Sequence, residues 1–285
     1  MIGDYLFFTG LNILLAWSVY VILLSGVMSF GNGAFMAVGA YIAGICTVKF
    51  GVPLEAALVI AALSCVAIGV LVGFPALRTR GLYLIMVTIG FAFCIRVAAE
   101  NIAYIGGVRG LRGLYGTTLW QVYGAIAVVG AGLWIIARSP LQRILDATRE
   151  DEAVAAAIGI NTVYIQLAAF AAGAGLAGFA GALYGHYMAF IAPDHFNILV
   201  SINIVLFVIF GGVNNMWGPV LGATIMTLLP EFVRVLAEWR TAFFSLVLLL
   251  LLLVRPDGLL SFRSLTARAA SRWPVRAPAT ADERR

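Results

Sequence analysis

Three groups of charged or titratable side chains stand out from a chain that is otherwise strongly apolar. The segment 139–161 holds the densest group: Arg143, Asp146, Arg149, Glu150, Asp151 and Glu152. The other two groups are Arg96 with Glu100, and His186 with Asp194 and His195. Side chains of these types can transfer protons, bind a metal or contact a partner, so their spacing has to decide which chemistry is available.

The spacing does not fit an enzyme. Neither an HExxH nor a GxSxG motif is present, and the two histidines and Asp194 are too few to converge on a metal, so we interpret them as interfacial polar residues. The one lysine, Lys49, is followed by Phe50, which excludes a GxxxxGK[ST] phosphate-binding loop. We expect no catalytic residues, no metal site and no cofactor bound by this chain.

The spacing of Arg96 and Glu100 allows an ion pair. The two residues are four apart within one apolar segment, so they can pair as i and i+4 neighbours on a helix. A charge inside a membrane must face a partner or water. We favour a structural ion pair or an interfacial position, and a place in a substrate path is the alternative.

The composition requires a membrane as solvent. Of the 285 residues, 62% are hydrophobic and 11% are charged, and the mean hydropathy is +1.02. Soluble domains carry roughly a quarter charged residues, so this chain cannot cover a water-exposed surface with charge. The net charge of +5 is better explained by membrane topology than by nucleic-acid binding. We predict an all-α integral membrane protein with no nucleic-acid partner.

The apolar segments predict a polytopic bundle of about nine spans. They are 5–27, 32–49, 54–74, 81–103, 117–137, 163–185, 198–213, 217–236 and 240–254. We assign residues 1–260 to this transmembrane domain. Residues 261–285 form a flexible basic tail that is suited to contact anionic lipid headgroups.

Two glycine-rich turns interrupt the apolar pattern: "SFGNGAF" at 29–35 and "FGGVNNMWGP" at 210–219. Non-helical backbone at membrane depth is stable only when protein buries it or when it faces a water-filled path, and broken helices often carry transporter sites. The resulting candidates for a substrate path are Gly31, Asn32, Gly33, Asn214 and Asn215. An ordinary loop at the membrane surface is the alternative for each turn.

The basic residues predict the orientation, because they are enriched on the cytoplasmic side of membrane proteins. If the segment 139–161 is cytoplasmic, the alternation of spans places 12 of the 18 basic residues on that side: Arg78, Arg80, Arg138, Arg143, Arg149, Arg255, Arg263, Arg268, Arg272, Arg276, Arg284 and Arg285. The N-terminus then lies outside and the C-terminus in the cytoplasm.

The segment 139–161 carries the signals of a capped helix pair. Ser139 is followed by a proline and then by Gln142, which is the arrangement of an N-cap with a capping-box partner. Gly159 suits a helix end, and Asn161 or Thr162 can cap the following span. The Ala-rich stretch between them favours helix and leaves small faces that a partner can approach. A solvated loop is the alternative, but a docking element is favoured.

Six segments carry a resemblance to a known family of membrane proteins. They are "FGNGAFMAVGAY" (30–41), "RTRGLYLIMVTIGFAF" (78–93), "SPLQRILDATREDEAVAAAIGIN" (139–161), "GLAGFAGALYGHYMAFIAPDHF" (175–196), "FGGVNNMWGPVLGA" (210–223) and "RPDGLL" (255–260). In this order they resemble the permeases of bacterial ABC importers for branched-chain amino acids, and specifically the M-type subunit.

The resemblance implies a set of partners. A permease of this family pairs with a second permease subunit, two ATP-binding subunits and an extracytoplasmic substrate-binding protein in the bacterial inner membrane, and ATP with Mg is bound by the ATP-binding subunits. The segment 139–161 corresponds to the family's cytoplasmic loop, whose coupling helix inserts into a groove of the ATPase. The residues expected at this contact are Arg149, Glu152, Ala153, Ala156 and Gly159.

The chain departs from the family at positions that can affect the substrate. Phe93 stands where relatives tend to have an acidic residue, and the run 105–110 lacks the Pro-Asn that relatives often have. Phe93, Arg96 and Gly107 therefore join the candidates for the path. An ABC permease for urea, short amides or other small carboxylates is one alternative. A stand-alone secondary transporter or channel is the other, although it has no need of a docking helix.

Overall fold

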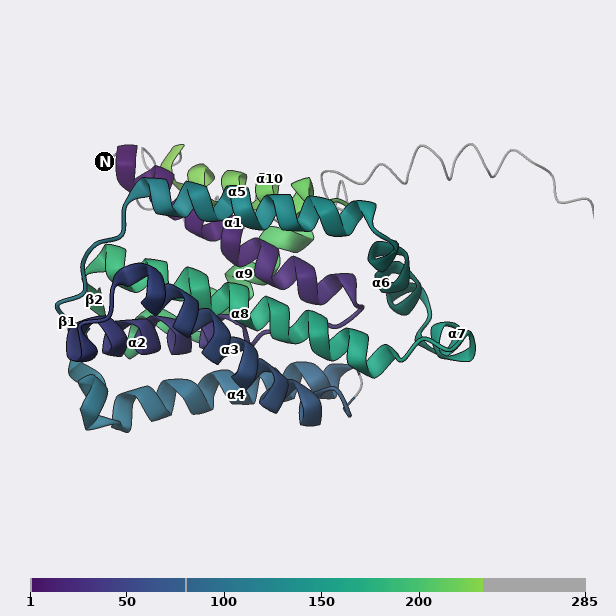
Figure 1. The fold of residues 1–285 in the computed structure, drawn as a ribbon, viewed down its shortest axis with the longest axis horizontal. Coiled ribbons are helices and arrows are strands. Elements are labelled where there is room, and N and C mark those ends of the chain that lie inside the picture. The colour runs from purple at the N-terminus through teal and green to yellow at the C-terminus, as the bar shows by residue number, and fades with distance from the viewer. Residues whose placement is uncertain (1, 80, 233–285) are drawn as a thin grey trace, which may run out of the picture.

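The computed structural model describes residues 2–79 and 81–232, and this part of the chain is almost entirely helical (Figure 1). Its α-helices are α1 (Ile2–Leu24), α2 (Asn32–Phe50), α3 (Leu54–Ala76), α4 (Leu82–Asn101), α5 (Leu119–Arg138), α6 (Pro140–Glu150), α7 (Glu152–Ala157), α8 (Thr162–Met188), α9 (Ile198–Gly211) and α10 (Trp217–Phe232). The predicted all-α class is confirmed.

Short elements connect the helices at one end of the bundle. They are the 3₁₀ turns η1 (Ala103–Ile105), η2 (Gly107–Arg109) and η3 (Pro193–Phe196), and the strands β1 (Leu111–Arg112) and β2 (Phe190–Ile191). The two strands pair antiparallel, with Leu111 opposite Ile191. This pairing joins the connection that follows α4 to the connection that follows α8.

Seven helices of the described residues are long and apolar enough to cross a membrane, and α10 is a shorter apolar helix. The protein is therefore a multi-pass membrane protein. Helix α9 reaches the length of a span only together with η3, which precedes it. The predicted segment 240–254 and the tail 261–285 lie outside the described residues, so the total of about nine spans stays a prediction.

Helix α8 is the centre of the bundle, where it packs against α1, α2 and α3. Its glycines allow this contact, because a Cβ atom at Gly178 would collide with the side chain of Cys65 and one at Gly181 would collide with the backbone of Met36. Gly39 of α2 likewise faces the backbone of Gly178. The Gly/Ala-rich stretch 171–185 of α8 thus permits close helix packing.

The bundle has two unlike ends (Figure 1). Helices α6 and α7 project beyond the spans at one end, which we call the α6–α7 end. The start of α1 and the paired strands lie at the opposite end, which we call the β1–β2 end. The segment 139–161 and the start of α1 therefore lie at opposite ends of the bundle. This is required because the five spans α1 to α5 separate them in the sequence. The assignment of the α6–α7 end to the cytoplasm stays a prediction.

Candidate functional site

The helix pair α6–α7 forms as its sequence signals predict, with one correction. The side chain of Ser139 caps α6 by accepting from the backbone N–H of Leu141 at 3.2 Å. Gln142 does not complete a capping box but donates to the carboxylate of Asp146 at 3.0 Å. The reason is that the backbone N–H of Ser139 already donates to the carbonyl of Ile136 in the last turn of α5, and this leaves Gln142 no donor to satisfy.

A second cap separates the two helices. The carboxylate of Asp151 accepts from the N–H groups of Ala153 and Val154 at 2.9 and 3.1 Å, which starts α7 in a new direction. Gly159 then ends α7 with a left-handed backbone of φ 88°, and Asn161 caps α8 as predicted. Glu152 accepts from the hydroxyl of the first residue of α8. The segment is thus an ordered element that is fixed at both of its ends.

Helix α7 exposes a small and partly apolar surface. Ala153, Ala156 and Gly159 are exposed, whereas Ala155 faces inward and is buried. Val154 and Ile158 are 58% and 69% exposed, although α7 lies beyond the ends of the spans. Apolar side chains that are held out of both the core and the membrane are typical of a contact surface for another protein.

Arg149 lies at the junction of α6 and α7 and faces the bundle. Its guanidinium donates to the side-chain oxygen of Asn214 at 3.0 Å and to the carbonyl of Val213 at 3.5 Å. These two residues belong to the turn between α9 and α10. The indole N–H of Trp17, on α1, donates to the carbonyl of Met216 in the same turn at 3.0 Å. The turn is therefore tied both to the projecting helix pair and to a span.

The first glycine-rich turn lies inside the bundle, where it precedes α2. Asn32 donates to the hydroxyl of Ser18 at 2.8 Å, and Ser18 is six residues, or about 9 Å, before the end of α1. The N–H of Gly33 donates to the hydroxyl of Ser201 at 3.0 Å. Asn32 and Gly33 begin α2, and Val27, Ser29 and Gly31 of the non-helical stretch before them are buried, which is the condition under which such backbone is stable at membrane depth. The interpretation as a surface loop is not supported.

One polar atom of this turn has no partner in the part of the chain that the structure describes. The side chain of Asn32 is fully inaccessible to solvent, and its oxygen accepts no hydrogen bond from the described residues. Buried acceptors are nearly always paired, so such an atom indicates a function or a second conformation.

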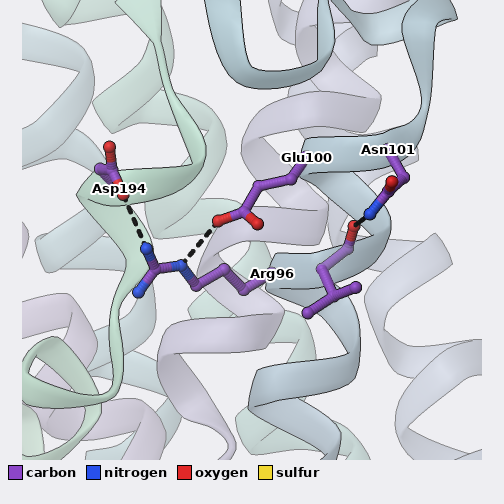
Figure 2. Close-up of polar contacts among 5 residues, drawn as sticks. Arg96, Glu100, Asn101 and Asp194 are labelled. Atoms are coloured by element: carbon purple, nitrogen blue, oxygen red, sulfur yellow. Dashed lines mark hydrogen bonds and ion pairs between the residues drawn. The ribbon is translucent and has the colours of Figure 1, made fainter.

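Arg96 lies in α4 near the β1–β2 end of the bundle. Its guanidinium lies between two carboxylates, and the three side chains form one cluster (Figure 2). Arg96 contacts Glu100 of the same helix at 2.9 Å and Asp194 of η3 at 2.8 Å. The predicted i,i+4 pair is confirmed, and the contact with Asp194 was not predicted. Phe93 is half exposed on the same helix, and Gly107 is buried in the turn that follows, with φ 53°.

The candidates for the substrate path lie at three levels. Asn214 lies at the α6–α7 end with Asn215 beside it, the turn 31–33 lies within the bundle, and Arg96 lies near the β1–β2 end. The structure does not gather them in one cavity, so their role in the path stays a prediction. It does bring the coupling candidate Arg149 into contact with the path candidate Asn214, which is 65 positions away.

The fold and the site define a class of protein. Apolar spans, buried non-helical backbone between two of them and a capped helix pair outside the bundle are features expected of a polytopic membrane permease. Among the described residues, no three His, Cys, Asp or Glu side chains lie close enough to hold a metal ion.

The chain belongs to the family described as "Branched-chain amino acid transport system / permease component", whose model matches residues 1–255. It is similar to the high-affinity branched-chain amino acid transport system permease protein LivM of Escherichia coli and to that of Salmonella typhimurium. Each is 30% identical over 276 residues, which covers 84% of this chain. The chain spans 65% of the length of these relatives. No solved structure matches the chain.

Proposed function

We propose that the protein is the permease subunit of an ATP-driven importer in the bacterial cytoplasmic membrane. It forms, with a second permease subunit, the path for branched-chain or related small amino acids. Two ATP-binding subunits hold ATP and Mg, and an extracytoplasmic binding protein delivers the substrate. Family membership and the similarity to the two LivM proteins support this proposal. The chain itself acts as a transport subunit and not as the ATP-hydrolysing enzyme.

The observation that carries the proposal is the capped pair α6–α7 with its exposed α7 surface. Two N-caps and a left-handed glycine hold this element in a fixed direction at the end of the bundle. A rigid element that presents small and apolar residues to the aqueous phase is suited to enter a groove on an ATPase. The contact of Arg149 with the α9–α10 turn then gives the motion of that ATPase a route to the spans.

Ala156→Trp tests the proposal most directly. Ala156 is exposed, so the added indole displaces nothing in the part of the chain that the structure describes, and we expect it to act through a partner that covers α7. Overpacking a fitted surface costs about 1–3 kcal/mol, so we expect binding-protein-stimulated ATP hydrolysis by the reconstituted complex to fall by roughly fivefold or more. Gly159→Leu should act in the same direction, with added strain because Gly159 is left-handed.

Glu150→Gln is the matched control. It changes the charge but not the size of an exposed side chain at the end of α6, and exposed charge contacts contribute about 1 kcal/mol or less. Near-normal hydrolysis is expected. Wild-type stimulation in Ala156→Trp would contradict the docking role of α7. Uptake by this chain in vesicles that contain neither ATP nor other subunits would instead support a stand-alone transporter.

A further inference from the structure

A long apolar groove runs between α3 and α5 at membrane depth. It encloses about 660 Å³, with α1 and α8 behind it, as the order of these helices in Figure 1 shows. Its walls include Ala62 of α3 and Gly132 of α5, and Phe179 of α8 lies behind them. Of the seven long helices, α5 is the least buried within the described residues. The groove therefore opens toward the surroundings of the protein, and at this depth the surroundings are hydrocarbon.

A second cavity continues the groove at the β1–β2 end. This chamber has a volume of about 510 Å³ and lies between the α2–α3 connection and the segment that precedes α5. Glu55 and Gln121 line both cavities, so the groove leads into the chamber. Both residues lie in the first turn of their helices, at the ends of two spans. A polar space is thus joined to an apolar one at the level where a bilayer changes from hydrocarbon to headgroups.

The dimensions fit one acyl chain. Along α5, the groove extends from Gln121 to Ile136, which is 15 positions or about 22 Å. One leaflet contributes about half of the roughly 30 Å hydrocarbon core, which is less than the length of the groove. An acyl chain that starts at the chamber can therefore stay in the groove through the whole depth of its leaflet. An empty groove would forfeit dispersion contacts along its whole lining, and water is not available there to fill it.

The charge of the chamber selects the headgroup. Glu55 is exposed, and it has no hydrogen bond or ion pair among residues 2–79 and 81–232. No lysine, arginine or histidine lines the chamber. Within this lining, Glu55 would repel an anionic headgroup and attract an ammonium group, whereas the nearby cations Lys49 and Arg112 are engaged with the rings of Tyr104 and Phe190. A helix of another subunit would cover the apolar groove but would leave the polar chamber unexplained.

We propose that the groove and the chamber form one binding site for a membrane phospholipid whose headgroup carries an ammonium group. Its acyl chain lies between α3 and α5, and its headgroup lies beside Glu55. With the predicted topology, this lipid belongs to the outer leaflet. The site is independent of the compound that the protein transports, because it faces the bilayer and uses none of the proposed path or coupling residues.

Two glycines of α5 provide a matched test of the groove. A Cβ atom would meet nothing within 4 Å at either Gly132 or Gly124, but Gly132 lines the groove and Gly124 does not. Both Gly→Leu substitutions change helix propensity equally. The full chain, purified with the subunits that accompany it, is titrated with palmitoyl-oleoyl phosphatidylethanolamine and followed by native mass spectrometry. We expect Gly132→Leu to lower lipid retention by tenfold or more and Gly124→Leu to leave it unchanged.

Substitutions of Glu55 test the headgroup. An exposed ion pair contributes up to about 1 kcal/mol, so Glu55→Gln should lower the preference for phosphatidylethanolamine over phosphatidylglycerol by roughly threefold to fivefold, and Glu55→Lys should reverse it. Equal retention by both leucine variants would overturn the site, and equal retention of both lipids by the wild type would overturn the headgroup assignment. If Gly132→Leu releases a membrane subunit but keeps its lipid, the groove binds a helix and the proposal is wrong.

Discussion

The two ends of the bundle are each fastened by one arginine, but the two arginines have different kinds of partner. At the α6–α7 end, Arg149 donates to the neutral oxygens of Val213 and Asn214. At the β1–β2 end, Arg96 lies between the carboxylates of Glu100 and Asp194. The first arginine connects a helix pair outside the spans to a turn between α9 and α10. The second connects two elements that already pack against each other, α4 and η3.

This difference indicates different roles for the two ends. The contact of Arg96 is one of several that hold α4 and η3 together, so its loss leaves the arrangement supported. The contact of Arg149 reaches from the projecting helix pair α6–α7 to the turn that also binds Trp17 of α1, so its loss removes a link in a chain of contacts. We infer that the α6–α7 end transmits motion and that the β1–β2 end keeps its shape.

The largest expected difference between the ends is their accessibility from outside the cell. In a background that lacks Cys46, Cys65 and Cys94, Tyr115→Cys at the β1–β2 end should react rapidly with an impermeant thiol reagent in intact cells. Leu141→Cys at the α6–α7 end should react only after the membrane is permeabilised. Both native side chains are exposed in the structure, so burial does not explain a difference. Rapid labelling of Leu141→Cys in intact cells would reverse the orientation.

Removal of the arginine at the α6–α7 end should have the next largest effect. A hydrogen bond from a charged donor contributes about 1.5 kcal/mol or more, so Arg149→Ala should lower ATP-dependent uptake by roughly tenfold. Asn214→Ala should give a smaller loss, and the double variant should lose less than the sum of the two single losses, because the two substitutions share the contact between Arg149 and Asn214. Strictly additive losses would show that the two residues act separately. ATP hydrolysis measured beside uptake separates uncoupling from loss of assembly.

Removal of the acidic partner at the β1–β2 end should have the smallest effect. The Asp194 side chain is 78% exposed, so solvent and salt screen its attraction to Arg96. Asp194→Asn should therefore change uptake by about fivefold or less, and the change should shrink as the salt concentration is raised. Glu100→Gln serves as the comparison within the same cluster. A larger loss in Asp194→Asn than in Arg149→Ala would break the proposed division between the two ends.

The parts of the fold that local sequence controls could be predicted. Helix caps depend on neighbouring residues, and for this reason Ser139, Gly159 and Asn161 have the predicted roles. The capping role of Asp151 was missed, although an aspartate before an Ala-rich helix is the expected signal. The capping-box role predicted for Gln142 was wrong because the backbone N–H of Ser139, which Gln142 would have accepted from, donates to the carbonyl of Ile136 in the preceding helix.

Contacts between distant segments could not be predicted from spacing. Arg149 and Asn214 are 65 positions apart, and Arg96 and Asp194 are 98 apart, so nothing local brings either pair together. For a similar reason, the sequence did not decide whether the turn before α2 is buried or lies at the membrane surface. Its partners Ser18 and Ser201 come from two other helices. Hydropathy placed these helices in the membrane but did not determine which faces meet.

The glycine contacts of α8 set an evolutionary limit on this chain. Where Gly39 meets Gly178, and where Gly181 meets Met36, the neighbouring atoms belong to backbone. Any codon change away from glycine adds atoms, and no second-site mutation can compensate by shrinking a neighbour that has no side chain in the contact. Gly124 of α5 faces open space and does not line the groove, so it carries no such restriction. Among descendants of this gene, a position such as Gly124 is therefore free to change, while the seam along α8 can be inherited or lost but not gradually rebuilt.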